Sequence, residues 1–169
     1  MGHRSHQRWK FNIKNLKLSM ITRLLSKAEI EAEPFRIWNA YVNLLAMEKY
    51  DHLSPKQRPA HLVFWYESEV QNGGHLQYFE NRGTRHLKAT IEALGKLEAI
   101  CQQQVLREAG ELWLSRSRPR VQTVREFRDK LDENEFETFD LRFHRCSPPL
   151  QQRLEEYLSR HLSSFISVT

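Results

Sequence analysis

The chain has 169 residues, of which 40% are hydrophobic and 28% are charged, and its formal net charge is +5. This length suits one domain, and nine Phe, five Tyr and four Trp supply enough large apolar side chains for a core. Six glycines and six prolines exclude collagen-like and low-complexity chains, and no apolar run approaches the roughly 18 residues that span a bilayer.

The positive charge is concentrated at the N-terminus. Residues 1–28 contain seven basic and no acidic residues, which leaves 19 basic and 21 acidic residues, a net charge of −2, in the rest of the chain. We interpret residues 1–33 as a basic arm, and favour a flexible tail over an organellar transit peptide or an upstream extension. Residues 34–169 are interpreted as a single helical domain. Attraction to phosphate would come mainly from the arm, through Arg4, Arg8, Lys10, Lys14 and Lys17.

The first predicted helix covers residues 34–50, where apolar residues occupy about half of the helical circumference. Ser54 and Pro55 predict the start of a second helix, since serine caps a helix and proline is tolerated in its first turn. Gly73 and Gly74 predict its end, because glycine adopts positive φ without strain. A short helix over residues 75–82 should follow and stop at Gly83.

The second half of the chain continues the helical pattern. Thr84 is expected to cap the next helix, which kinks or divides near Gly95. Thr123 and Glu126 form a capping-box pattern for another helix, and Ser147-Pro148-Pro149 precedes the last apolar stripe. No alternation typical of strands and no internal repeat is present. The fold class predicted is therefore all-α, a compact multi-helix bundle with a basic N-terminal arm.

The two cysteines, Cys101 and Cys146, show neither CxxC nor Cys/His spacing. We expect free thiols in a reducing compartment. Polar and charged residues interrupt every apolar run near the N-terminus, so no secretory signal is predicted. The expected location is cytoplasmic.

The most distinctive string covers residues 67–81 and joins two predicted helices through the two glycines. It gathers the carboxylate of Glu69 and three amides near the free N–H groups of a helix start. In the interpretation that we favour, these groups satisfy the backbone around the turn. In the other, they bind a partner or ligand. The candidate binding residues are Glu69, Asn72, Gly73, Gly74, Gln77 and Asn81.

This string, as the pattern Glu69-x-x-Asn72-Gly73-Gly74-x-x-Gln77-x-Phe79-x-Asn81, resembles the bacterial DNA-mimic-protein family. The C-terminal domain of that family is a widespread helical domain of largely unknown function. The helix with Trp38, the Leu53-Ser54-Pro55 sequence and the closing Leu154-Tyr157 helix also fit, so the resemblance covers about residues 35–165. It implies a small cytoplasmic helical protein. The member that names the family is a dimer whose acidic surface imitates duplex DNA and sequesters a transcription factor, so the resemblance makes a homodimer one state to test.

The charge of this chain departs from that of a DNA mimic. A mimic presents rows of carboxylates at phosphate-like spacing, whereas the body here has a net charge of only −2. The acidic run in residues 132–140 is the local candidate for mimicry, and the basic stretch 116–130 could neutralise it. We therefore carry over the fold and a binding role, and expect a non-enzymatic, regulatory protein–protein interaction module that acts through the surface beside Gly73 and Gly74.

Two alternatives remain open. The first is nucleic-acid binding through the basic arm. The second is a small-molecule or hydrolytic site around Glu69, Asn72 and Gln77. An acid/base set can also be assembled from His61, Glu67, Glu69 and His75, but no spacing enforces the geometry that catalysis needs. No helical metal-binding pattern is present, so we expect no catalytic residue, metal or cofactor. We expect the aromatic rings near the motif, those of Trp65, Tyr66, Tyr78 and Phe79, to pack in the core rather than stack on bases.

Overall fold

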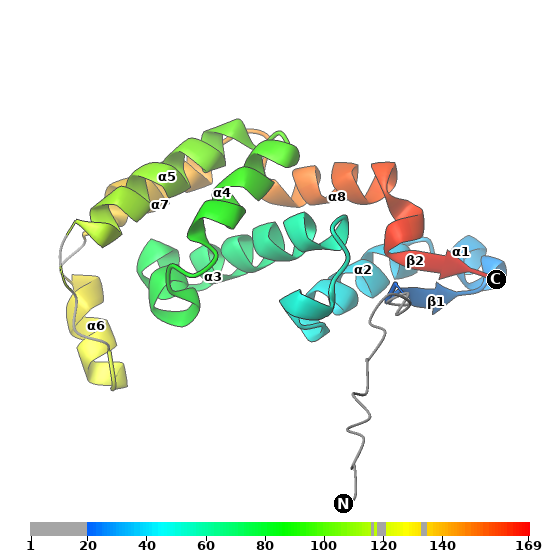
Figure 1. Cartoon of the computed structure of the whole chain (residues 1–169), viewed down its shortest axis with the longest axis horizontal. Helices are drawn as coiled ribbons and strands as arrows, with labels where there is room; N and C mark the ends of the chain where they lie inside the picture. Colours follow the sequence, from blue (N-terminus) through cyan, green and yellow to red (C-terminus); the bar gives the residue numbers. More distant parts are fainter. Residues whose placement is uncertain (1–19, 116, 118–120, 133–134) are drawn as a thin grey trace, which may run out of the picture.

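The computed structural model describes residues 20–115, 117, 121–132 and 135–169. Within them the chain forms eight α-helices and a pair of short strands, which confirms the predicted all-α class (Figure 1). In this part of the chain, no helix combines the length and the apolar content that crossing a membrane requires.

The elements follow one another along the chain with short connections. They are β1 (Arg23–Leu25), α1 (Lys27–Ala32), α2 (Phe35–Met47), η2 (Tyr50–His52), α3 (Gln57–Arg82), α4 (Leu87–Lys96), α5 (Ile100–Leu114), α6 (Val124–Asp132), α7 (Glu137–Arg145), α8 (Leu150–Arg160), η3 (Leu162–Ser164) and β2 (Ile166–Val168).

Helix α3 is the centre of the fold, since it contacts α2, α4, α7 and α8. Its inner face carries Tyr66, Tyr78 and Phe79, which are at most 3% exposed. Tyr66 and Tyr78 meet edge to face, with ring centroids 5.0 Å apart. The prediction that the aromatic rings near the motif belong to the core is confirmed for these three, whereas Trp65 is only half-buried.

Most of the helix boundaries that we predicted from capping residues and glycines agree with the structure. Ser54 Oγ accepts from the Gln57 N–H (3.3 Å) and Gln57 Oε1 accepts from the Ser54 N–H (2.9 Å), so this start is a reciprocal cap. The division predicted near Gly95 is confirmed by the break between α4 and α5. Thr123 Oγ1 caps α6 through the Glu126 N–H at 3.2 Å. The cap predicted at Thr84 is wrong, because α4 begins after His86 and has no side-chain cap.

The strand pair was not predicted. β1 and β2 pair in parallel, with Arg23 opposite Ile166, so residues near the two ends of the described chain lie side by side (Figure 1). Strands of three residues are too short to show alternation. The buried amide of Gln57 joins the same region, since its Nε2 donates to the carbonyls of Ile21 and Ser164. Part of the segment interpreted as an arm therefore packs on the helical body.

The prediction of free thiols is wrong, because Cys101 and Cys146 form a disulfide with their Cα atoms 5.6 Å apart. Helix α5 packs on α7, so the first turn of α5 meets the residue that follows α7, although 45 positions separate the two cysteines. Disulfides are typical of oxidising compartments. The bond removes the free thiols on which the expectation of a reducing compartment rested, and the cytoplasmic location stays a prediction.

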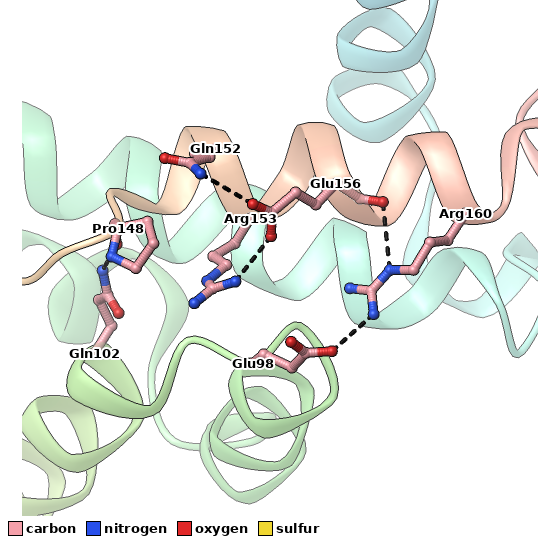
Figure 2. Close-up of polar contacts among 7 residues, drawn as sticks. All are labelled: Glu98, Gln102, Pro148, Gln152, Arg153, Glu156 and Arg160. Carbon is pink, nitrogen blue, oxygen red and sulfur yellow. Dashed lines mark hydrogen bonds and ion pairs between the residues drawn. The ribbon is translucent and has the colours of Figure 1, made fainter.

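Polar contacts also connect α8 to α5 and to the turn between α4 and α5. Figure 2 shows Gln102 of α5 donating to the carbonyl of Pro148 (2.8 Å), just before α8. It also shows Arg160, at the end of α8, paired with Glu98 in the turn between α4 and α5 (2.8 Å). The first contact joins the start of α8 to α5, and the second joins the end of α8 to the α4–α5 turn.

Candidate functional site at the kink of helix α3

Helix α3 is two helical segments joined at Gly73 and Gly74, whose backbone angles are not helical. Gly74 has φ +71°, a conformation that strains any residue with a Cβ. A Cβ at Gly74 would also clash with the Asp140 carboxylate, and one at Gly73 would clash with the Gln77 amide. Gly74 is therefore required by its backbone conformation as well as by its contact with Asp140, whereas Gly73 is restricted only by its contact with the flexible Gln77 side chain.

The carboxylate of Glu69 joins the two segments. Glu69 precedes the kink and is 8% exposed. Its Oε2 accepts from Gln77 Nε2 (2.9 Å) and from Asn81 Nδ2 (2.8 Å), and its Oε1 accepts from Arg82 Nε (2.9 Å). All three donors follow the kink, so each bond crosses it.

The remaining candidate, Asn72, extends this set, which we call the Glu69 network. Asn72 Nδ2 donates to Gln77 Oε1 at 3.0 Å, and Gln77 therefore bridges Asn72 and Glu69. The structure brings all six predicted residues together, and the four that carry side chains are joined by hydrogen bonds. This agrees with the structural interpretation of the motif, while binding of a partner by these residues stays a prediction.

A second hydrogen-bonded network lies at the same kink and was not predicted from the sequence. His75 is fully buried, and both its backbone N–H (2.8 Å) and its Nδ1 (2.6 Å) bond Asp140 Oδ1. Its Nε2 bonds the Tyr66 hydroxyl at 2.9 Å. Asp140 belongs to α7 and so caps the second segment of α3 from another helix. Asp140 lies in the acidic run that we had noted, but no spacing pairs it with His75.

Two clefts lie next to the kinked helix. The α7 cleft, of about 190 Å³, is lined by residues that include Leu76, Lys130, Glu137, Asp140, Leu141 and His144. The Trp65 cleft, of about 70 Å³, lies between η2, α3 and the start of α4, and its lining includes Tyr50, His61, Trp65, Arg82, His86 and Thr90. None of Glu69, Asn72, Gln77 and Asn81 lines either cleft.

Two basic residues next to the acidic run form ion pairs with other helices. Lys130 Nζ pairs with Glu80 Oε1 of α3 at 2.9 Å. Arg142 of α7 pairs with Glu108 of α5, which lowers the pKa of the Glu108 carboxyl to about 2. These cations therefore meet carboxylates of other helices, and Glu137 stays at the surface.

The acid/base set is not assembled at one place. His75 bonds Asp140 and Tyr66 in the core. Burial raises the pKa of Glu67 to about 7, although the Gln151 backbone at the start of α8 donates to it. Burial lowers the pKa of His61 to about 4. Within the described ranges, no group of three or more His, Cys, Asp or Glu side chains is placed to hold a metal ion.

The candidate nucleic-acid contacts Arg4, Arg8, Lys10, Lys14 and Lys17 lie outside the described residues. Comparison with known protein families gives a match within the rest of the chain. The model of a family described as DMP19-like protein matches residues 51–161, from η2 to the end of α8. No curated protein and no solved structure matches the chain.

Proposed function

The chain belongs to the DMP19-like protein family, and we propose that it is a non-enzymatic protein–protein interaction module whose binding surface is the α7 cleft. The observation that carries the proposal is the position of Asp140. Its Oδ1 holds His75 at the kink, and its side chain also lines the α7 cleft. The glycine motif thereby sets the position of α7, and with it the shape of this surface.

The lining of the cleft suits a basic partner. Leu141 is 49% exposed and lies one helical turn after Glu137, whose side chain is at the surface. A lysine or arginine of a partner could pack its aliphatic stem on Leu141 and place its charged group beside the carboxylate. Proteins that bind nucleic acid carry such basic surfaces, which fits the partner class that the family description implies.

The hydrolytic alternative has less support. A general base needs a lone pair that can reach a substrate proton. The oxygens of Glu69 accept from Gln77, Asn81 and Arg82, and Asn72 is bonded to Gln77. The polar groups that such a site requires are thus engaged with one another.

Affinity capture with surface variants tests the interaction role. The full chain and its Glu137→Lys/Leu141→Lys variant are used as baits in nuclease-treated lysate from the native host. The matched control is Glu111→Lys/Leu114→Lys, an exposed carboxylate and leucine on α5. We expect a partner that the wild type and the α5 variant retain and that the α7 variant loses. Equal capture by all three, or no specific partner, would contradict the proposal, provided that melting curves show folded proteins.

Nucleic-acid binding through the arm is a second candidate, because residues 1–28 contain seven basic and no acidic residues. Deletion of residues 1–19 is the informative variant, since it leaves β1 in place. If the arm binds DNA, affinity falls steeply with salt and is lost on deletion. Binding that survives the deletion would exclude the arm as its source.

A further inference from the structure

The Trp65 cleft lies apart from the α7 cleft and shares none of the lining residues named for it. Its walls are mostly aromatic. The Tyr50 ring lies 4.5 Å from the His86 ring and 6.0 Å from the His61 ring, measured between centroids. His61 also meets the edge of Trp65, at 6.4 Å. Two imidazoles and a guanidinium therefore lie in a pocket whose other walls are mainly aromatic and aliphatic.

Arg82 supplies the positive charge of this cleft. Its Cζ lies 3.6 Å from the centroid of the Trp65 ring, and its Nε is bonded to Glu69. Among the described residues, nothing accepts a hydrogen bond from its two terminal nitrogens. The Glu69 network thus orients a guanidinium whose outer edge is available to a ligand. Such an edge matches the two oxygens of a carboxylate.

His61 adds a second observation. His61 is 9% exposed, and its ring is held between the cleft and the Leu45 backbone of α2, which forms a hydrogen bond with it. Burial lowers the pKa of His61 to about 4, so the ring is neutral near physiological pH. The cleft therefore gains a neutral imidazole rather than a second cation.

We propose that the Trp65 cleft binds a carboxylate group, with Arg82 as its cationic partner and His61 and His86 beside it. Because Glu69 already offsets much of the Arg82 charge, and because the walls include Leu62 and Trp65, the cleft favours a monoanion over a doubly charged phosphate. About 70 Å³ accommodates the carboxylate and the first carbons attached to it. The remainder of the ligand, a small organic acid or the C-terminus of a peptide, extends into solvent.

Titration of the full chain, followed by proton–nitrogen NMR correlation spectra at constant ionic strength, tests this proposal. Propionate is the first probe, propionamide is its uncharged match, and inorganic phosphate is the competing anion. The indole signal of Trp65, assigned with Trp65→Phe, reports on the cleft. We expect a saturable shift with propionate and affinity for propionamide at least about tenfold weaker, because a charged hydrogen-bond pair is lost.

Variants identify the residue responsible. Arg82→Gln should weaken propionate binding at least about tenfold. Arg58→Gln is the matched control, since that guanidinium lies 5.2 Å from the centroid of the Tyr50 ring and is not part of the lining. Because Arg82→Gln also removes a partner of Glu69, His86→Phe is tested in parallel. It keeps a ring against Tyr50, removes both nitrogens, and should weaken binding several-fold.

The ligand source is separated by an N-acetylated alanine tripeptide, with its C-terminus free or amidated. Tighter binding of the free form than of propionate identifies a peptide end, and equal or weaker binding identifies a small acid. The proposal is overturned by a shift that does not saturate, by equal affinity for propionamide, by tighter binding of phosphate, or by equal effects of Arg82→Gln and Arg58→Gln.

Discussion

Two hydrogen-bonded networks meet at one kink, and they differ in how far they reach along the chain. The Glu69 network lies within α3, where its most distant pair, Glu69 and Arg82, is 13 positions apart. The network of His75 joins α3 to α7, because its carboxylate comes from Asp140, 65 positions away. The first network holds the two segments of one helix together, and the second holds two helices together.

The two networks also differ in burial. Asn72, at the edge of the Glu69 network, is exposed, whereas His75 and Tyr66 are completely buried. An interrupted hydrogen bond is replaced by water at the surface but leaves an unpaired group in the core. We therefore expect the His75 network to contribute more to stability, and the following experiments rank the two.

We expect the largest loss of unfolding free energy when the covalent link that holds the end of α7 to α5 is removed. The disulfide between Cys101 and Cys146 closes a loop of 45 positions that contains α6 and α7. The Cys101→Ser/Cys146→Ser variant should lose about 4 kcal/mol of unfolding free energy, since the unfolded chain is no longer restricted. Urea denaturation measures the loss, and the wild type in reductant should match the variant. A loss of under about 1 kcal/mol would contradict this expectation.

Asp140→Ala breaks the long-range network directly. It leaves the backbone N–H and ring Nδ1 of the buried His75 without their acceptor, and should cost about 3 kcal/mol. Glu137→Ala, at an exposed position of the same helix, is the control and should change stability by under about 0.5 kcal/mol. If Asp140→Ala costs no more than Glu137→Ala, the His75 network does not fasten α7.

Glu67 offers a further comparison with Glu69. Burial is the main influence on the pKa of Glu67, whereas the carboxylate of Glu69 accepts hydrogen bonds from three side chains. Burial raises the pKa of Glu67 from 4.5 to about 7, so the folded state holds its proton more tightly than the unfolded state. Its contribution to stability is therefore greatest below about pH 4.5 and falls as the pH rises to about 7. Glu67→Gln should be more stable than the wild type by roughly 2 kcal/mol above this range.

Denaturation curves at a series of pH values measure the Glu67 effect. The advantage of Glu67→Gln should disappear in acid, where the wild-type carboxyl is also neutral. Gln151, which donates its backbone N–H to this side chain, can donate equally to a glutamine. An advantage that is independent of pH would show that packing, rather than ionisation, distinguishes the two proteins.

The smallest effect belongs to the exposed edge of the Glu69 network. Asn72→Ala removes one hydrogen bond to Gln77 and should cost roughly 0.5 kcal/mol. Gln71→Ala, its exposed neighbour, is the control and should have no measurable effect on the melting temperature. A cost above about 2 kcal/mol would place Asn72 among the structural determinants, and a cost above that of Asp140→Ala would reverse the ranking of the two networks.

The features that sequence analysis predicted are those in which the interacting residues are near one another in the chain. Ser54 and Gln57 cap one helix across three positions, and Gly74 sets the kink through a positive φ that glycine adopts without strain. The residues of the Glu69 network were predicted as one group because they lie in one short segment. The kink in that segment then brings their side chains close to one another.

Asp140 and the cysteines show why other features were missed. The acidic run containing Asp140 was noted for its charge, yet its bond to His75 depends on where α7 crosses α3. The free thiols predicted for Cys101 and Cys146 were wrong for the same reason, since the bond depends on how α5 packs against α7. Spacing along the chain contains no information about either crossing.

The amino-acid sequence by itself determined the helical class, the division of the chain into helices and the membership of the central string, since these depend on hydrophobic period, caps and glycine conformations over a few residues. Only the tertiary structure decided which carboxylate meets His75, which thiols join, and that the Trp65 cleft places Arg82 beside two imidazoles. Such contacts arise from the packing of apolar helix faces, and packing brings together residues whose distance in sequence is arbitrary.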